Sequence, residues 1–205
     1  DLDVTTRGAM SLGRRLQDPL AELVKIDPKS IGVGQYQHDI NQKLLEGALS
    51  NVVEDCVNRV GVDLNTASPS LLSYIAGVNM GIAKNIVAYR EENGKFTDRK
   101  QLMKVPKLGE KAFRQCAGFL RITDGDNPLD ATSVHPESYG AAMAMMNKLD
   151  VDSEAIRKGG DKSIEDKIKK LYGNKNLKQS IAMMADELGV GEITLADIVG
   201  EMKKP

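Results

Sequence analysis

Apolar residues recur every three or four positions along most of this 205-residue chain, which is the spacing of one face of an α-helix. No stretch alternates apolar and polar residues with the two-residue period of a half-buried strand. The pattern predicts a first helix that is capped by Thr5 or Thr6 and stopped by Asp27-Pro28. A second helix ends at Gly61, because glycine readily adopts the positive φ that closes a helix. We therefore expect an all-α fold.

The chain beyond Gly61 predicts short helices in three regions. Residues 61–122 contain a repeat of short helices, and the turn-forming residues 124–128 mark a boundary after it. A helix over residues 137–149 and three short amphipathic helices from Ser163 onward complete the chain. The expected architecture is therefore short helices with a tandem helix-hairpin-helix domain, divided into segments 1–60, 61–124 and 125–205.

An internal repeat with a period of thirty residues carries the functional signal. When residues 72–86 are set above residues 102–116, two copies of a helix, a four-residue turn and a second helix coincide. The turns are 76–79 and 106–109, and each places an apolar residue, Val78 or Leu108, where it can pack between the helices. A turn this short needs a residue at positive φ, and we expect Asn79 and Gly109 to supply it at the fourth position.

Such a turn leaves unpaired backbone N–H groups at the start of its second helix, where the positive end of the helix dipole also favours an anion. We interpret the anion as a phosphate of the DNA or RNA backbone, with a basic residue one to two turns along each helix as its charge partner. Binding should then be weakly sequence-specific and strongly salt-dependent. The candidate nucleic-acid-binding residues are Gly77, Val78, Asn79, Gly81, Lys84, Lys107, Leu108, Gly109, Lys111 and Arg114.

The distribution of charge agrees with this interpretation, although the total does not. The whole chain has a formal net charge of −1. Ten lysines and arginines and five acidic residues lie between residues 61 and 122, which gives this segment +5 and leaves −6 on the rest. A basic module is therefore embedded in an acidic chain. The similar turn Gly189-Val190-Gly191 has no basic residue at the matching offset, so we expect a structural hairpin there.

Other classes of function find little support in the sequence. No run approaches the roughly 20 apolar residues of a membrane-spanning helix, so we expect no membrane partner. Cys56 and Cys116 lie in apolar helical patterns and are expected to be buried free thiols, which fits a reducing, cytoplasmic compartment.

No catalytic residues, metal site or cofactor are expected, and we do not expect an enzyme. Phosphate-loop and dinucleotide-binding motifs are missing from the sequence. The acidic residues Asp124, Asp126 and Asp130 lack the spacing of a calcium loop and are interpreted as a solvated turn. His38 and His135 are expected at the surface or as helix caps.

Long stretches of the chain resemble known families. Residues 62–94, from Val62-Asp63-Leu64 onward, resemble the tandem hairpin domain of the bacterial DNA-uptake receptor ComEA. Residues 14–38, residues 53–67 and the run Asn127-Pro128-Leu129-Asp130 resemble the Tex family of transcription accessory proteins more closely.

This resemblance implies a fragment of a longer protein that acts in transcription. Residues 1–60 would close an upstream RNase H-like (YqgF-type) domain and add a linker helix. Residues 125–205 would precede an OB-fold RNA-binding module. An alternative hypothesis is a helical scaffold that docks to RNA polymerase or ribosome-associated proteins through the methionine-rich helices at residues 141–146 and 181–184.

Overall fold

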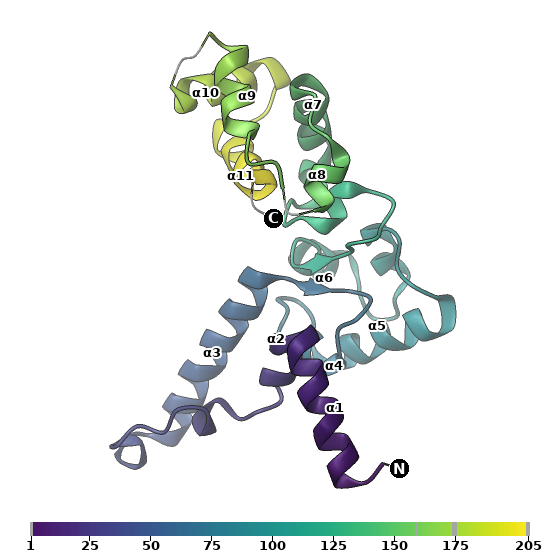
Figure 1. The fold of residues 1–205 in the computed structure, drawn as a ribbon, viewed down its shortest axis with the longest axis vertical. Coiled ribbons are helices and arrows are strands. Elements are labelled where there is room, and N and C mark those ends of the chain that lie inside the picture. The colour runs from purple at the N-terminus through teal and green to yellow at the C-terminus, as the bar shows by residue number, and fades with distance from the viewer. Residues whose placement is uncertain (1, 159, 174–175, 204–205) are drawn as a thin grey trace. The chain divides into compact units, whose positions relative to one another are not determined.

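A computed structural model describes residues 2–158, 160–173 and 176–203, which fold as two compact units (Figure 1). The first unit comprises residues 1–95 and 102–119, and the second comprises residues 96–101 and 120–205. The all-α prediction is confirmed, because the only strands in the described parts of the chain are β1 (Val62–Asp63) and β2 (Leu120–Arg121). The three-segment division at residues 60 and 124 stays a prediction.

The first unit begins with two helices, α1 and α2, where the sequence pattern predicted one. The bounds of its helices, with those of the short 3₁₀ helices, are α1 (Val4–Gln17), α2 (Pro19–Leu23), η1 (Pro28–Ser30), η2 (Gln37–Asp39), α3 (Gln42–Val60), α4 (Pro69–Leu72), α5 (Met80–Asn93) and α6 (Glu110–Cys116). The 3₁₀ helix η3 (Arg99–Lys104) takes residues from both units.

The predicted first helix is broken at Asp18, and its cap was assigned to the wrong residues. Asp3, and neither threonine, caps α1, because its carboxylate accepts a hydrogen bond from the Thr6 N–H at 2.8 Å. Asp18 leaves helical geometry at φ −145° and ψ 87°, as expected for a residue before proline. Its carboxylate then caps α2 by accepting from the Ala21 N–H at 3.1 Å. A local side-chain cap thus outweighs the continuous apolar pattern.

Helix α3 ends at Gly61 as predicted, with Gly61 at φ +75°. An asparagine near that end fixes α3 to the entrance of the first hairpin. The Asn58 side-chain amide donates to the Tyr74 carbonyl at 3.0 Å and accepts from the Ala76 N–H at 3.0 Å. Both polar groups of one side chain are therefore used to hold the turn that begins at Ala76.

The second unit is a helical bundle (Figure 1). Its elements are η4 (Pro128–Ala131), η5 (Pro136–Ser138), α7 (Tyr139–Leu149), α8 (Ser153–Arg157), α9 (Ile164–Leu171), α10 (Leu177–Leu188) and α11 (Glu192–Lys203). Helices α7, α9, α10 and α11 contact one another around one core. The sequence pattern predicted all four of these helices and missed the five-residue α8.

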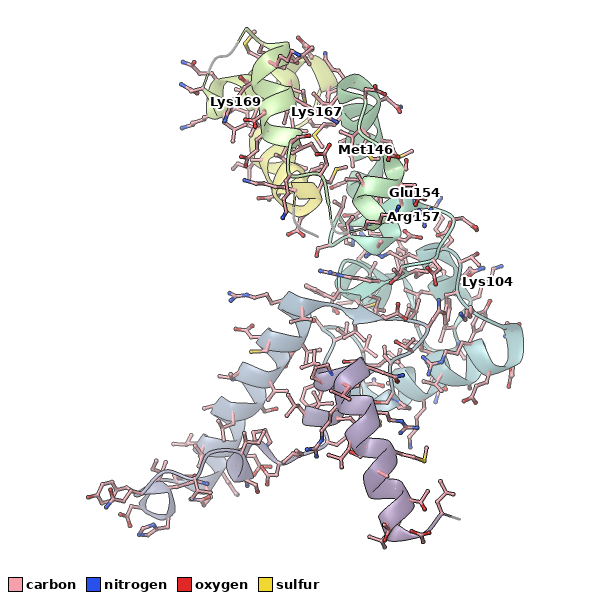
Figure 2. The ribbon with its side chains drawn as sticks, in the orientation of Figure 1. Lys104, Met146, Glu154, Arg157, Lys167 and Lys169 are labelled. Carbon is pink, nitrogen blue, oxygen red and sulfur yellow. The ribbon has the colours of Figure 1, made fainter. Side chains whose placement is uncertain are left out.

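Three of the five methionines in segments 141–146 and 181–184 lie in that core, while Met143 and Met183 are 41% and 39% exposed. Met145 and Met184 are fully buried and Met146 is 4% exposed, so these side chains are not available as the docking surface of the alternative hypothesis. Figure 2 shows Met146 on α7, and Glu154 and Arg157 on α8. The Arg157 guanidinium donates to the Gly125 carbonyl at 2.6 Å and to the Asp126 carbonyl at 3.1 Å, which ties α8 to the turn that precedes η4.

A buried arginine organises the beginning of the second unit. Arg99 is fully buried, and its guanidinium donates to a tyrosine hydroxyl and to four backbone carbonyls, those of Leu120, Leu129, Thr132 and Val134. The hydroxyl is that of Tyr139, which in turn donates to Asp130 at 2.5 Å. Burial raises the pKa of Asp130 and that of Tyr139.

Two of the smaller predictions need correction. Asp130 is fully buried, so it does not belong to a solvated turn. Cys116 is buried as expected, and its thiol donates to the Phe113 carbonyl at 3.7 Å, whereas the thiol of Cys56 is exposed, contrary to the prediction. His135 caps η5, as predicted, by accepting from the Glu137 N–H at 3.3 Å. Within the described ranges, no helix has the length and apolar character needed to cross a membrane.

Candidate nucleic-acid interface

The two turns of the repeat have the same backbone conformation. Gly77 and Lys107, at the second position of each turn, have φ of +80° and +67°. Asn79 and Gly109, at the fourth position, have φ of −85° and −81° with ψ of 169° and 174°. The prediction that the fourth residues adopt positive φ was therefore wrong. The left-handed residue lies two positions earlier, and a lysine accepts this strained conformation in the second copy.

The fourth residue has a different task, which is to begin the second helix. The Asn79 side chain accepts a hydrogen bond from the Ile82 N–H at 2.9 Å, as asparagine does at the start of many helices. Gly109 has no side chain to make this bond, so α6 begins without a side-chain cap. The third residues, Val78 and Leu108, are 4% and 3% exposed, which confirms that each packs inside its hairpin.

Each hairpin supports the turn of the other, and the contacts follow the thirty-residue register. Asn85 on α5 donates to the Pro106 carbonyl of the second turn at 2.7 Å. Gln115 on α6, thirty residues after Asn85, lies against Gly77 of the first turn. A Cβ added to Gly77 would be 2.8 Å from the Gln115 Cβ, a distance that real Cβ atoms essentially never show. Glycine at position 77 therefore avoids both the strain of positive φ, which Lys107 bears in the second hairpin, and the clash with Gln115.

The start of α5 has the properties expected of a phosphate contact. Gly77, Asn79 and Gly81 are all exposed. Among the described residues, no acceptor takes the N–H of Met80 or of Gly81. Lys84 is exposed one turn further along the same helix and has no ion pair with any described residue. Free donors and a free cation therefore lie on one exposed end of a 14-residue helix.

The start of α6 differs in its charges. Lys107 and Lys111 are exposed, as predicted for phosphate contacts. Arg114 is exposed too, but its Nη2 lies 2.7 Å from Oε1 of Glu110, the first residue of the helix. The predicted charge partner of the second copy is therefore already paired within the protein.

The structure thus brings the ten predicted residues together as two equivalent turns in one unit. Val78 and Leu108 are buried, and their N–H groups already donate to the carbonyls of Ile75 at 2.9 Å and Val105 at 3.2 Å, so these two residues offer a phosphate no donor. Sequence reasoning missed Asn85, Gln115 and Glu110. The register pairs residue 85 with residue 115, and Glu110 precedes Arg114 by four positions, so both signals were present in the sequence.

Comparison with known proteins finds similar hairpins and similar longer proteins. Residues 57–121 match a family model described as the helix-hairpin-helix motif, and residues 127–205 match one described as an HHH domain. The whole chain is 54% identical to the transcriptional accessory protein Tex of Neisseria gonorrhoeae and 55% identical to protein YhgF of Escherichia coli. Over its full length the chain is therefore similar to proteins of the Tex family. The resemblance read from residues 14–38, residues 53–67 and residues 127–130 is confirmed.

The Tex relatives are longer than this chain. The chain spans 25% of the length of both the Neisseria gonorrhoeae and the Escherichia coli protein. It is also 38% identical over its whole length to the human S1 RNA-binding domain-containing protein 1, of which it likewise spans 25%. The hairpin matches and these relatives together support nucleic-acid binding as the class of function.

The second family match concerns the second unit. The turn 189–191 joins α10 to α11 inside the matched range, and Gly189 has φ +65°. Residue Glu192 follows as the first residue of α11, where the first hairpin has Met80. The assignment of this turn as a structural hairpin stays a prediction.

Proposed function

We propose that this Tex-family segment binds the phosphate backbone of DNA or RNA without sequence specificity, through its two helix-hairpin-helix turns. The observation that carries the proposal is the exposed start of α5, where the N–H groups of Met80 and Gly81 lack an acceptor among the described residues and Lys84 lacks an ion pair. Backbone donors recognise phosphate oxygens equally well beside any base, so the contact carries little sequence information.

In this proposal the residues have three roles. The N–H groups of residues 77, 79–81, 107 and 109–111 donate to phosphate oxygens, whereas those of Val78 and Leu108 already donate to the carbonyls of Ile75 and Val105. The side chains of Lys84, Lys107, Lys111 and Arg114 supply positive charge. Gly77, Asn79 and Gly109 keep the backbone open to a close approach, while Val78 and Leu108 anchor the turns in the core. The proposed function is binding without catalysis.

The longer Tex proteins provide the biological setting of the proposal. We infer that the segment contributes nucleic-acid contacts to a longer cytoplasmic protein that acts in transcription, because the gonococcal relative is named a transcriptional accessory protein. Contacts with RNA polymerase or ribosome-associated proteins belong to the same inference. Met145, Met146 and Met184 are buried, so such contacts would use the exposed side chains of these helices, which include Met143 and Met183, or other surfaces.

The test is a charge reversal at Lys84. Lys84→Glu should weaken binding to labelled duplex DNA and single-stranded RNA by about ten- to hundredfold, because a hydrogen bond to a charged group contributes about 1.5–3 kcal/mol. Fluorescence anisotropy gives the affinity, and circular dichroism checks that the helices persist.

Lys43→Glu is the matched control, because Lys43 is exposed near the start of α3, the end opposite Asn58. At 1.5 Å per helical residue it lies roughly 22 Å along the axis from Asn58. This variant has the same change in net charge and should bind nearly normally. Equal losses in both variants would show that only overall charge matters and would refute the assigned site.

A further inference from the structure

The two hairpins differ at the position where their second helices begin. Met80 is the first residue of α5, and Glu110, thirty residues later, is the first residue of α6. Both are exposed. A carboxylate in the first turn of a helix offsets the positive end of the helix dipole, whereas a thioether leaves it unchanged. The same place in the repeat is therefore neutral in one hairpin and negatively charged in the other.

Glu110 also engages the cation of its own hairpin. Its Oε1 lies 2.7 Å from Nη2 of Arg114, at the four-residue spacing of neighbours on a helix. The equivalent cation in the first hairpin, Lys84, has no ion pair with any residue that the structure describes. The Arg114 and Glu110 side chains are 57% and 72% exposed, so water screens their attraction and another anion can compete for Arg114.

The backbone does not account for this difference. The φ and ψ angles of Asn79 and Gly109 agree within about 5°, from −85° and 169° to −81° and 174°. The residues two positions earlier, Gly77 and Lys107, are both at positive φ. A phosphate would therefore meet the same course of the backbone at both turns. The side chains differ, because the second hairpin presents the Glu110 carboxylate beside the exposed cations Lys107 and Lys111.

We propose that the Glu110 carboxylate competes with phosphate for Arg114. The first hairpin is then the main contact with the nucleic-acid backbone, and Arg114 contributes little to binding in the second. This inference rests on the proposed function, because it assigns unequal strength to the two hairpins of the same interface. A phosphate at the second turn must approach a carboxylate and displace it from Arg114. At the first turn, the first helical position presents no negative charge to it.

The experiment measures what each cation contributes with and without the competitor. Lys84→Ala and Arg114→Ala are each made in the unaltered chain and in Glu110→Met, which gives the second hairpin the residue of the first. Binding to a short fluorescein-labelled duplex DNA is measured by anisotropy. In the unaltered chain we expect Lys84→Ala to weaken binding about tenfold and Arg114→Ala less than about twofold. In the Glu110→Met background, Arg114→Ala should also weaken binding about tenfold.

The reverse exchange transfers the competitor to the first hairpin. Met80→Glu should weaken binding and should reduce the effect of Lys84→Ala to less than about twofold, because the introduced carboxylate would pair with Lys84 at the same four-residue spacing. The double exchange Met80→Glu, Glu110→Met keeps the net charge. In that background Arg114→Ala should weaken binding more than Lys84→Ala does. Glu92→Met, at an exposed position near the end of α5, is the control for the loss of one negative charge.

The outcomes separate this inference from the proposed function. If Arg114→Ala costs as much as Lys84→Ala in the unaltered chain, and Glu110→Met strengthens binding no more than Glu92→Met, Glu110 is not a competitor although the hairpins bind. If neither alanine variant weakens binding in any background, the proposed interface itself is wrong. Should circular dichroism show that Met80→Glu does not fold, four other variants decide the question. These are Arg114→Ala, Glu110→Met, and Glu110→Met combined with Lys84→Ala or with Arg114→Ala.

Discussion

At the scale of single residues, position 107 shows how the fold overrides a local preference. Lys107 occupies the left-handed conformation, φ +67°, that Gly77 occupies in the first hairpin. That conformation costs a residue with a Cβ roughly 1–2 kcal/mol. Sequence reasoning placed positive φ at Asn79 and Gly109 because those residue types tolerate it. The packing of Val78 and Leu108 inside their hairpins fixes the conformation of the turn, so the residue at the second position must adopt positive φ whatever its type.

The strain at Lys107 predicts that glycine stabilises this turn. Lys107→Gly should raise the free energy of unfolding by about 0.5–1 kcal/mol, because relief of roughly 1–2 kcal/mol of strain exceeds the roughly 0.5–1 kcal/mol of backbone entropy that glycine loses on folding. Urea denaturation measures the change. Lys107→Ala removes the same charge and keeps the Cβ, so it should show no gain. Equal stability of the two variants would mean that the turn carries no strain.

At the scale of elements, polar side chains decide where helices begin, end and attach. Asp18 divides the predicted first helix, and Asn58 clamps α3 to the first turn through Tyr74 and Ala76. The helices that the periodicity predicted were mostly present, with boundaries that moved to the nearest cap or proline. The clamp could not be foreseen, because its partners lie 16 and 18 residues away and hydrophobic spacing carries no information about them.

The network around Arg99 is the strongest such attachment, because it fastens the start of η3 to the elements that lead into α7. Arg99→Met should lower the free energy of unfolding by at least about 3 kcal/mol, since several buried carbonyls and the Tyr139 hydroxyl would lose their donor and each such loss costs about 1–3 kcal/mol. Chemical denaturation measures the change. Lys100→Met removes the same charge from an exposed neighbour and should change stability by less than about 0.5 kcal/mol. A similar small effect at Arg99 would show that water replaces the lost donor.

At the scale of the whole molecule, the arrangement of charge matters more than its sum. A chain of net charge −1 has no general attraction for nucleic acid, yet residues 61–122 carry +5. The exposed cations of the hairpins, Lys84, Lys107 and Lys111, belong to this segment and to one unit. Their effect on binding should therefore be local, and it should appear in the dependence on salt.

Salt dependence counts the phosphates that are neutralised on binding. The logarithm of the association constant should fall linearly with the logarithm of salt concentration, and Lys84→Ala should make that slope shallower by about 0.7–0.9, the value of one released counterion. Titrations of labelled DNA and RNA over a range of potassium chloride concentrations give the slope. Lys43→Ala should leave it unchanged. Binding that does not respond to salt would argue against phosphate contact.

The sequence by itself determined the helical fold, the thirty-residue repeat, the positions of the two turns and the resemblance to the Tex family, because helical periodicity and paired motifs are local patterns that one chain displays directly. Tertiary structure decided the rest. It buried Asp130 and three methionines, placed positive φ at Lys107, and paired Arg114 with Glu110. These outcomes depend on which distant groups meet in the folded chain, and the free energy of a buried or paired side chain is set by those neighbours and not by its position in the sequence.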